Sequence, residues 1–386
     1  MRFKVISILA GVVLGLLISG CSLAFSQDDS SIRQDSHPQS LSIEEKANHI
    51  VSQMSDSQKI GQLMMIGFRT TVIDEDAKHM LASCPMGNVI LFDRNMEEPE
   101  QVTKLNSDIR QTLTKRNGVV PLIAVDQEGG MVKRMADYLP DMPSAEQIGQ
   151  GNSEQAELWA EKTGRALDSL GFNTNFAPVV DLDSTYHRSY GEKPEVVISF
   201  AKAVIKGYDS AGLYTSMKHF PGIGKVKTDP HVDGDVVNIT RENLDKEDGK
   251  PFKILISETD PNRTFIMVSN VTFPQLDKTN PACFSKEIIT NILRQDYGFK
   301  GIILTDDMEM GAISKHYAFK DMGVRAIEAG ADIVLVCQNY QHEQAVFNGM
   351  LDAYRNGRLD RNLVDEKVRH IVYVKLVHEI AFNKKD

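Results

Sequence analysis

Eight short apolar runs recur along this chain, and longer segments with the pattern of amphipathic helices separate them. Most of the runs are apolar almost without interruption, which is typical of strands buried on both faces of a parallel sheet. The runs cover residues 63–68, 86–92, 121–126, 173–183, 214–220, 264–270, 301–307 and 331–337. The helical segments include residues 154–170, 195–211, 285–297, 312–329, 342–356 and 362–379. Eight strands that alternate with helices predict an α/β fold, a (β/α)8 TIM-type barrel.

The barrel is expected to form one domain. No linker rich in Gly, Ser or Pro interrupts residues 42–386, and we expect no αβα domain at the C-terminal side of the barrel. An open doubly wound sheet is the alternative that eight strands also permit. Because no Gly-x-Gly-x-x-Gly loop follows the early strands, nothing in the sequence supports dinucleotide binding.

The N-terminal segment has the features of a bacterial lipoprotein signal peptide over residues 1–20. It begins with two basic residues, continues with a short apolar core and ends with small residues directly before Cys21. This ending resembles the lipoprotein signal-peptidase box, which implies that Cys21 carries lipid after cleavage. Residues 21–41 then form a flexible tether, and the protein lies in the cell envelope, anchored to a bacterial membrane on its periplasmic or outer face. An ordinary secretory signal with an incidental cysteine is the alternative.

Charge and cysteine content limit the partners. The net charge of −10 argues against nucleic acid and against electrostatic attraction to anionic lipid. Three further cysteines, Cys84, Cys283 and Cys337, form an odd and irregularly spaced set, which indicates neither a disulfide framework nor a zinc site. Cys337 lies in an apolar run and is expected to be a buried thiol. One disulfide between two of the three remains open.

Polar residues gather where five consecutive predicted strands end. In a barrel of this kind the catalytic residues lie at the C-terminal ends of the strands, so these side chains are expected at one mouth. In chain order the strand ends carry Asp126 and Glu128 with Arg134, Asp181 and Asp183 with Arg188, Lys218-His219, Ser269-Asn270 and Asp306-Asp307.

Some of these residues also have a purely structural explanation. Asp126 is suited to cap a helix, and Arg134 and Arg188 are suited to a solvated surface. Lys218 is different, because it ends a predicted buried strand where an unpaired ammonium group is costly. It therefore needs an acidic partner or a polar ligand, and the same reasoning favours a function for Asp306.

Five segments in order match one family. They read Asp126-Gln127-Glu128-Gly129-Gly130-x-Val132-x-Arg134, Phe176-Ala177-Pro178-Val179-Val180-Asp181, Arg188-Ser189-Tyr190-Gly191, Lys218-His219-Phe220-Pro221-Gly222 and Thr305-Asp306-Asp307-Met308-Glu309-Met310. These segments resemble the motifs of glycoside hydrolase family 3, specifically of its bacterial β-N-acetylglucosaminidases.

The resemblance implies a catalytic role for three residues. Asp306 corresponds to the nucleophile of a retaining glycosidase, which forms a covalent glycosyl intermediate. His231 corresponds to the acid/base, and Asp229 to its dyad partner. An imidazole suits proton transfer in both directions near neutral pH.

The resemblance also implies the binding residues and the partners. The side chains expected to bind the hydroxyl and acetamido groups of the terminal sugar are Asp126, Arg134, Arg188, Lys218 and His219. The expected partners are a carbohydrate with terminal N-acetylglucosamine and, through lipidated Cys21, a membrane. Neither a metal nor an organic cofactor is expected, and we expect a monomer.

The chain departs from the family pattern at two positions. Ile223 stands where the family often has a histidine, and Pro230 separates the two members of the dyad. Proline restricts the residue before it to extended conformations, which bears on the orientation of Asp229.

The sequence therefore predicts a retaining exo-β-N-acetylglucosaminidase that acts on cell-wall muropeptides or chito-oligosaccharides. A β-glucosidase, a β-xylosidase or an N-acetylglucosaminide phosphorylase of the same family is the alternative. A non-catalytic, lipid-anchored glycan-binding protein is the alternative of another class. The presence of Asp306 and of the Asp229–His231 dyad disfavours it.

Overall fold

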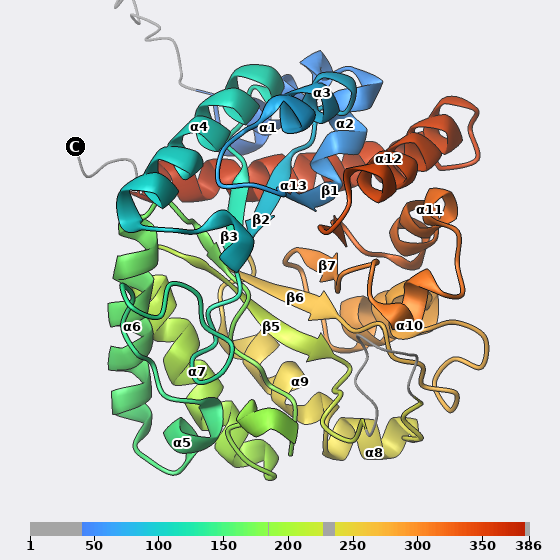
Figure 1. Ribbon diagram of the computed structural model, residues 1–386. Helices are drawn as coiled ribbons and strands as arrows, with labels where there is room; N and C mark the ends of the chain where they lie inside the picture. Colours follow the sequence, from blue (N-terminus) through green and yellow to red (C-terminus); the bar gives the residue numbers. More distant parts are fainter. Residues whose placement is uncertain (1–40, 184, 227–235, 383–386) are drawn as a thin grey trace, which may run out of the picture. The chain divides into compact units, whose positions relative to one another are not determined.

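The computed structural model describes residues 41–183, 185–226 and 236–382. Its centre is a parallel sheet of eight strands, in the order β7-β6-β5-β4-β3-β2-β1-β8 (Figure 1). The strands are β1 Met64–Gly67, β2 Asn88–Leu91, β3 Leu122–Val125, β4 Thr174–Asn175, β5 Tyr214–Phe220, β6 Thr264–Val268, β7 Ile303–Thr305 and β8 Val334–Val336. Each of them lies within one of the eight predicted runs.

The sheet closes on itself, so the predicted (β/α)8 barrel is confirmed. Strand β1 pairs in parallel with β8, with Met65 opposite Leu335. Strands β7 and β8 meet at the Leu304–Ile333 bridge, where the backbone N–H of Thr305 donates to the carbonyl of Ile333 at 3.0 Å. The alternative prediction of an open doubly wound sheet is wrong, because such a sheet has no pairing between its first and last strands.

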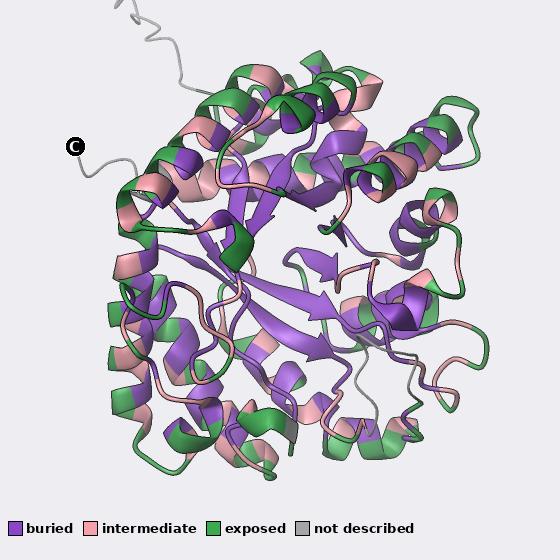
Figure 2. Cartoon of the chain, viewed as in Figure 1, coloured by how far each residue is buried: buried purple, intermediate pink, exposed green. Residues whose placement is uncertain are grey.

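Helices surround the strands on the outside of the barrel (Figure 1). Every strand residue is buried, whereas the helices expose one side to solvent (Figure 2). Burial on both faces of the sheet accounts for the almost unbroken apolar runs. The longer helices are α1 Ile43–Gln53, α4 Pro99–Asn117, α6 Ser153–Ser169, α7 Pro194–Ser210, α9 Gly249–Glu258, the π-helix η4 Glu287–Asp296, α11 Phe319–Ala329, α12 Tyr340–Arg355 and α13 Arg361–Phe382.

Shorter helical segments lie between these elements. They are α2 Asp56–Gln62, α3 Glu75–Ser83, η1 Asp93–Asn95, α5 Ala145–Gly149, η2 Thr185–His187, α8 Arg241–Lys246, η3 Ala282–Phe284 and α10 Gly311–Ser314. The boundaries follow local signals in the sequence. For example, Ser55 and Gln58 form a capping box at the start of α2.

Two predicted elements differ from the observed ones. The segment 312–329 was expected to be one helix, but the chain leaves α10 and turns to an extended residue, Ala318, before α11 begins. In that turn the ring of Tyr317 packs edge-on against Phe284, with the ring centroids 5.0 Å apart. Strand β4 is much shorter than predicted, because Pro178 has no N–H to donate. Beyond it the pairing with β5 continues through the Val179–Lys218 bridge and a hydrogen bond of 3.1 Å from the Ser216 N–H to the Ala177 carbonyl.

The cysteines at positions 84, 283 and 337 are all buried and free, so none of them forms a disulfide. The predicted buried thiol at Cys337 is confirmed. None of the helices in the described part of the chain is long and apolar enough to cross a membrane. The predicted signal peptide, Cys21 and the tether lie outside the described residues, apart from Leu41.

Candidate active site

A pocket of about 440 Å³ opens at the C-terminal ends of the barrel strands. The loops that follow β3, β4, β6 and β7 line it, together with the end of β5. Its polar lining includes Asp126, Glu128, Arg134, Arg188, Lys218, His219, Asn270, Asp306 and Asp307. The volume lies within the usual range for sites that bind small molecules.

The loop after β3 is fixed by its neighbours and by two glycines. The side chain of Asn175 on β4 accepts the backbone N–H of Gln127 and donates to its carbonyl, both at 2.9 Å. Gly129 and Gly130 have left-handed φ angles of 94° and 59°. A Cβ atom at either position would approach the chain at 143–144 within 2.6 Å, so only glycine fits here. The tight turn holds Asp126 and Glu128 at the pocket.

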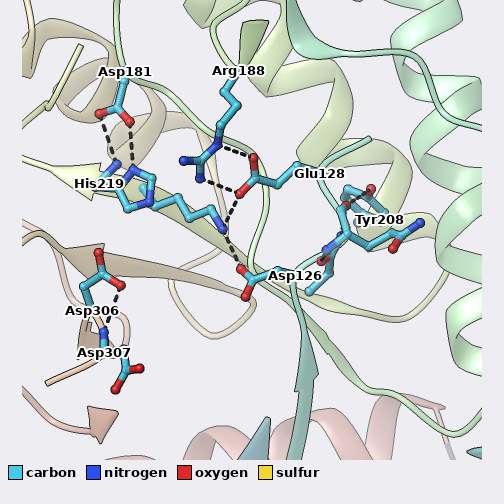
Figure 3. Close-up of polar contacts among 11 residues, drawn as sticks. Asp126, Glu128, Asp181, Arg188, Tyr208, His219, Asp306 and Asp307 are labelled. Carbon is cyan, nitrogen blue, oxygen red and sulfur yellow. Dashed lines mark hydrogen bonds and ion pairs between the residues drawn. The ribbon is translucent and has the colours of Figure 1, made fainter. Parts of the chain in front are cut away.

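A network of charges lines one part of the pocket, which we call its closed end because the side chains of Lys218 and Glu128 are only 3% and 6% exposed there. The Nζ atom of Lys218 lies 2.7 Å from Asp126 Oδ1 and 2.7 Å from Glu128 Oε1. Glu128 also accepts two hydrogen bonds of 2.8 Å from Arg188, which comes from the loop after β4 (Figure 3). Two carboxylates, those of Asp126 and Glu128, thus serve as the acidic partners that a buried Lys218 requires.

The charges in this network maintain one another in the ionised state. Burial acts to raise the pKa of Glu128, but attraction to Lys218 and Arg188 outweighs it and holds the pKa well below its usual range. Burial likewise acts to lower the pKa of Lys218, yet Asp126 and Glu128 raise it above the ordinary value. The pocket therefore presents fixed donors and acceptors, which suits recognition of sugar hydroxyl groups.

His219 is held beside this network by Asp181. Its Nδ1 atom lies 2.8 Å from Asp181 Oδ2, and its backbone N–H donates to Asp181 Oδ1 at 3.2 Å (Figure 3). The backbone N–H of Ile223 donates to the same oxygen at 2.9 Å. Asp181 is 1% exposed and thus fixes both the imidazole and the turn that follows it.

Asp306 and Asp307 follow β7 at another wall of the pocket. The carboxylate of Asp306 accepts the backbone N–H of Asp307 at 2.8 Å, and Figure 3 shows no contact between Asp306 and the charge network. The carboxyl of Asp307 accepts the backbone N–H of Glu309, and burial raises its pKa to about 6. Asn270 donates to the carbonyl of Asp307 at 2.8 Å, while its own Oδ1 is buried and has no partner among the described residues.

Arg134 also lines the pocket, and its side chain is 18% exposed. Its guanidinium donates to the exposed Asp93 at 3.0 Å, and its backbone N–H donates to Gln127 Oε1 at 2.6 Å. Its Nε atom is buried without a partner among the described residues. The Nε–H of Arg134 is therefore a donor that no described residue satisfies.

Six of the predicted site residues line this one pocket, namely Asp126, Arg134, Arg188, Lys218, His219 and Asp306. Asp229 and His231 lie outside the described residues. No group of three or more His, Cys, Asp or Glu side chains in the described part of the chain is arranged to hold a metal ion.

Three site residues were not assigned a role from the sequence, although each was visible in it. Glu128 and Asp181 are the partners of predicted binding residues, and Asn270 follows β6. The need of a buried Lys218 for an acidic partner is the signal in the sequence that could have indicated Glu128.

The chain matches the model of the Glycosyl hydrolase family 3 N terminal domain over residues 56–374. It is 35% identical over 283 residues to a Beta-hexosaminidase of Neisseria gonorrhoeae, which covers 70% of this chain and 75% of that relative. It is 31% identical over 309 residues to a Beta-hexosaminidase of Haemophilus ducreyi, covering 78% of the chain and 87% of the relative. For Beta-hexosaminidase A of Pseudoalteromonas piscicida the identity is 29%, and the chain spans only 54% of that protein.

Solved structures show the same similarity. A glycoside hydrolase family 3 β-N-acetylglucosaminidase from Paenibacillus superposes with a TM-score of 0.81 at 34% identity, covering 85% of this chain and 63% of that one. A β-N-acetylhexosaminidase from Beutenbergia cavernae gives a TM-score of 0.78 at 28% identity, covering 83% of this chain and 98% of that one.

Proposed function

Because this chain belongs to glycosyl hydrolase family 3, we propose that it is a retaining exo-β-N-acetylglucosaminidase that works through a covalent intermediate on Asp306. The observation that carries the proposal is the position of Asp306, whose carboxylate lies in the same pocket as the Lys218 network. A sugar bound by the network is thereby brought beside a carboxylate that is suited to attack. The names of the relatives support N-acetylglucosamine as the terminal sugar.

The proposed reaction has two steps. In the first, Asp306 attacks C1 of the terminal sugar, the bond from C1 to the leaving oxygen breaks, and His231 gives its proton to that oxygen. In the second, water attacks C1, His231 takes the proton of the water, and the bond to Asp306 breaks. Asp229 is proposed to orient the imidazole and to stabilise its charged form.

The charge network is proposed to bind the sugar hydroxyl groups. Asp126 and Glu128 offer acceptors, while Lys218 and Arg188 offer donors, and all four are held by one another before the sugar arrives. Such preorganisation reduces the ordering that binding must impose. The buried Oδ1 of Asn270 is suited to accept a further hydrogen bond from the substrate.

The natural substrate is proposed to be a chito-oligosaccharide or a cell-wall muropeptide with terminal β-linked N-acetylglucosamine. The decisive experiment follows the first sugar released from p-nitrophenyl N-acetyl-β-glucosaminide by proton NMR, because this substrate yields a single sugar product. A retaining enzyme releases the β-anomer first, and mutarotation follows. Initial release of the α-anomer contradicts the covalent intermediate, and formation of the sugar 1-phosphate in phosphate buffer identifies a phosphorylase instead.

We also propose that the protein is anchored to a bacterial membrane through lipid on Cys21. This rests on the sequence of residues 1–21, which lie outside the described residues. Metabolic labelling with a palmitate analogue tests it. Label is expected in the wild type and not in Cys21→Ser, and equal labelling of both contradicts the assignment.

A further inference from the structure

Two large and exposed side chains stand at the rim of the pocket. Tyr186, after β4, is 54% exposed, and Met131, after β3, is 64% exposed. Both line the pocket that holds Asp306 and Lys218. Large apolar surfaces left open beside a binding site commonly mark where a ligand makes contact.

The backbone of Tyr186 has a conformation that bulky residues rarely adopt. Its φ is 69° and its ψ is 24°, in the left-handed region that favours glycine. The adjacent His187 has a φ of 58°, so two consecutive non-glycine residues are strained. Because its ring stays half exposed, burial of the ring does not account for this strain. Strain of this kind concentrates at ligand clamps and active sites.

Contacts on the C-terminal side of Tyr186 hold the strained turn. The Nδ1 atom of His187 lies 2.5 Å from Glu146 Oε2 on α5. Arg188 makes its two hydrogen bonds of 2.8 Å to Glu128. The same ion pair that anchors the closed end of the pocket therefore also positions Tyr186 at its rim.

The position of the rim indicates which part of a substrate it meets. The terminal sugar is proposed to occupy the closed end, with its C1 at Asp306, so the next sugar must extend outward past the rim. One face of a pyranose ring carries mainly C–H groups, which match an aromatic face and a thioether. We propose that Tyr186 and Met131 form an apolar platform for the sugar on the leaving-group side, an inference that rests on the proposed glycosidase function.

The test compares two substrates that share the terminal sugar. N,N′-Diacetylchitobiose has a sugar on the leaving-group side, and N-acetyl-β-glucosaminyl fluoride has none. Tyr186→Ala is expected to raise KM for chitobiose by roughly 3- to 10-fold, the range expected from the loss of one aromatic contact. It is expected to leave kcat/KM for the fluoride within about twofold, and Tyr186→Phe should behave as the wild type on both substrates.

Two further variants make the result decisive. Tyr186→Gly suits the left-handed backbone and should show the same selective increase in KM, so the test stands even if Tyr186→Ala folds poorly. Tyr138→Ala removes a tyrosine that is 55% exposed but does not line the pocket. This variant should leave both KM for chitobiose and kcat/KM for the fluoride unchanged.

The outcomes separate the two proposals. An unchanged KM for chitobiose in both Tyr186→Ala and Tyr186→Gly overturns the platform, and so does an equal loss on both substrates. In either case the glycosidase function stands, because the wild type still hydrolyses them. A wild type that hydrolyses neither substrate contradicts the proposed function, and the platform fails with it.

Discussion

Lys218 and Glu128 form a buried ion pair, with Nζ and Oε1 2.7 Å apart, at the ends of two strands that are not neighbours in the sheet. Their side chains are 3% and 6% exposed. Attraction between them offsets the cost of burial only while both are present. The pair thus connects substrate binding with the stability of the barrel mouth.

Replacing Glu128 with Gln is expected to lower the free energy of unfolding by about 3–5 kcal/mol, because Lys218 and Arg188 then share one fewer buried negative charge. Urea unfolding of the two proteins at pH 7 measures this difference. The pKa of Glu128 is lowered in the folded state, so its contribution is present above the unfolded pKa of about 4.3 and is lost as the pH falls below it.

The control for that experiment is Asp108→Asn, which breaks the exposed pair with Lys104 and should cost less than about 1 kcal/mol. Equal free energies of unfolding for Glu128→Gln and the wild type at pH 7 would show that the network does not stabilise the fold.

Lys375 should make stability depend on pH in the alkaline range. The residue is buried on α13, and burial lowers its pKa to about 7. The unfolded chain holds this proton up to a pH of about 10.4, so the free energy of unfolding rises with pH between the two values. The Tm of the wild type relative to Lys375→Met is therefore expected to increase from pH 7 to pH 10.

Lys104→Met, at an exposed position, should show no such trend relative to the wild type. A constant difference between the wild type and Lys375→Met over this range contradicts a lowered pKa at Lys375.

His231→Ala is expected to reduce kcat/KM for chitobiose by about 10²- to 10⁴-fold, the usual contribution of a general acid. The loss on p-nitrophenyl N-acetyl-β-glucosaminide should be much smaller, because its leaving group needs little protonation. His49→Ala, on the exposed side of α1, serves as the matched control. Equal losses on both substrates argue against a role in proton transfer.

The strand pattern predicted the barrel because strands buried on both faces are apolar at nearly every position. The sequence could not show how far each strand pairs. Strand β4 keeps only two residues in the ladder, since Pro178 removes a donor, and the single bridge between β7 and β8 closes the sheet. The break between α10 and α11 coincides with the packing of Tyr317 against Phe284, a tertiary contact that the sequence pattern does not reveal.

The candidate site could be predicted where the position of one residue implies that it requires a charged partner. A lysine at the end of a buried strand requires a counter-charge, so Lys218 was identified, but its partner lies 90 positions earlier in Glu128. The sequence placed Asp181 at the end of a strand but did not indicate its contact with His219. Tyr186 had no signal at all, because only the folded chain shows that its backbone is left-handed at the rim of the pocket.

The most direct test of the proposed catalytic role of Asp306 is the rate of aryl-glycoside hydrolysis by the wild type and Asp306→Ala. On a panel of p-nitrophenyl glycosides, the wild type is expected to prefer the N-acetyl-β-glucosaminide over the β-glucoside and the β-xyloside. Asp306→Ala should lose activity on the order of 10⁴-fold or more, the scale seen when a catalytic nucleophile is removed. Substantial residual turnover by Asp306→Ala, with the fold intact, would contradict its role as the nucleophile.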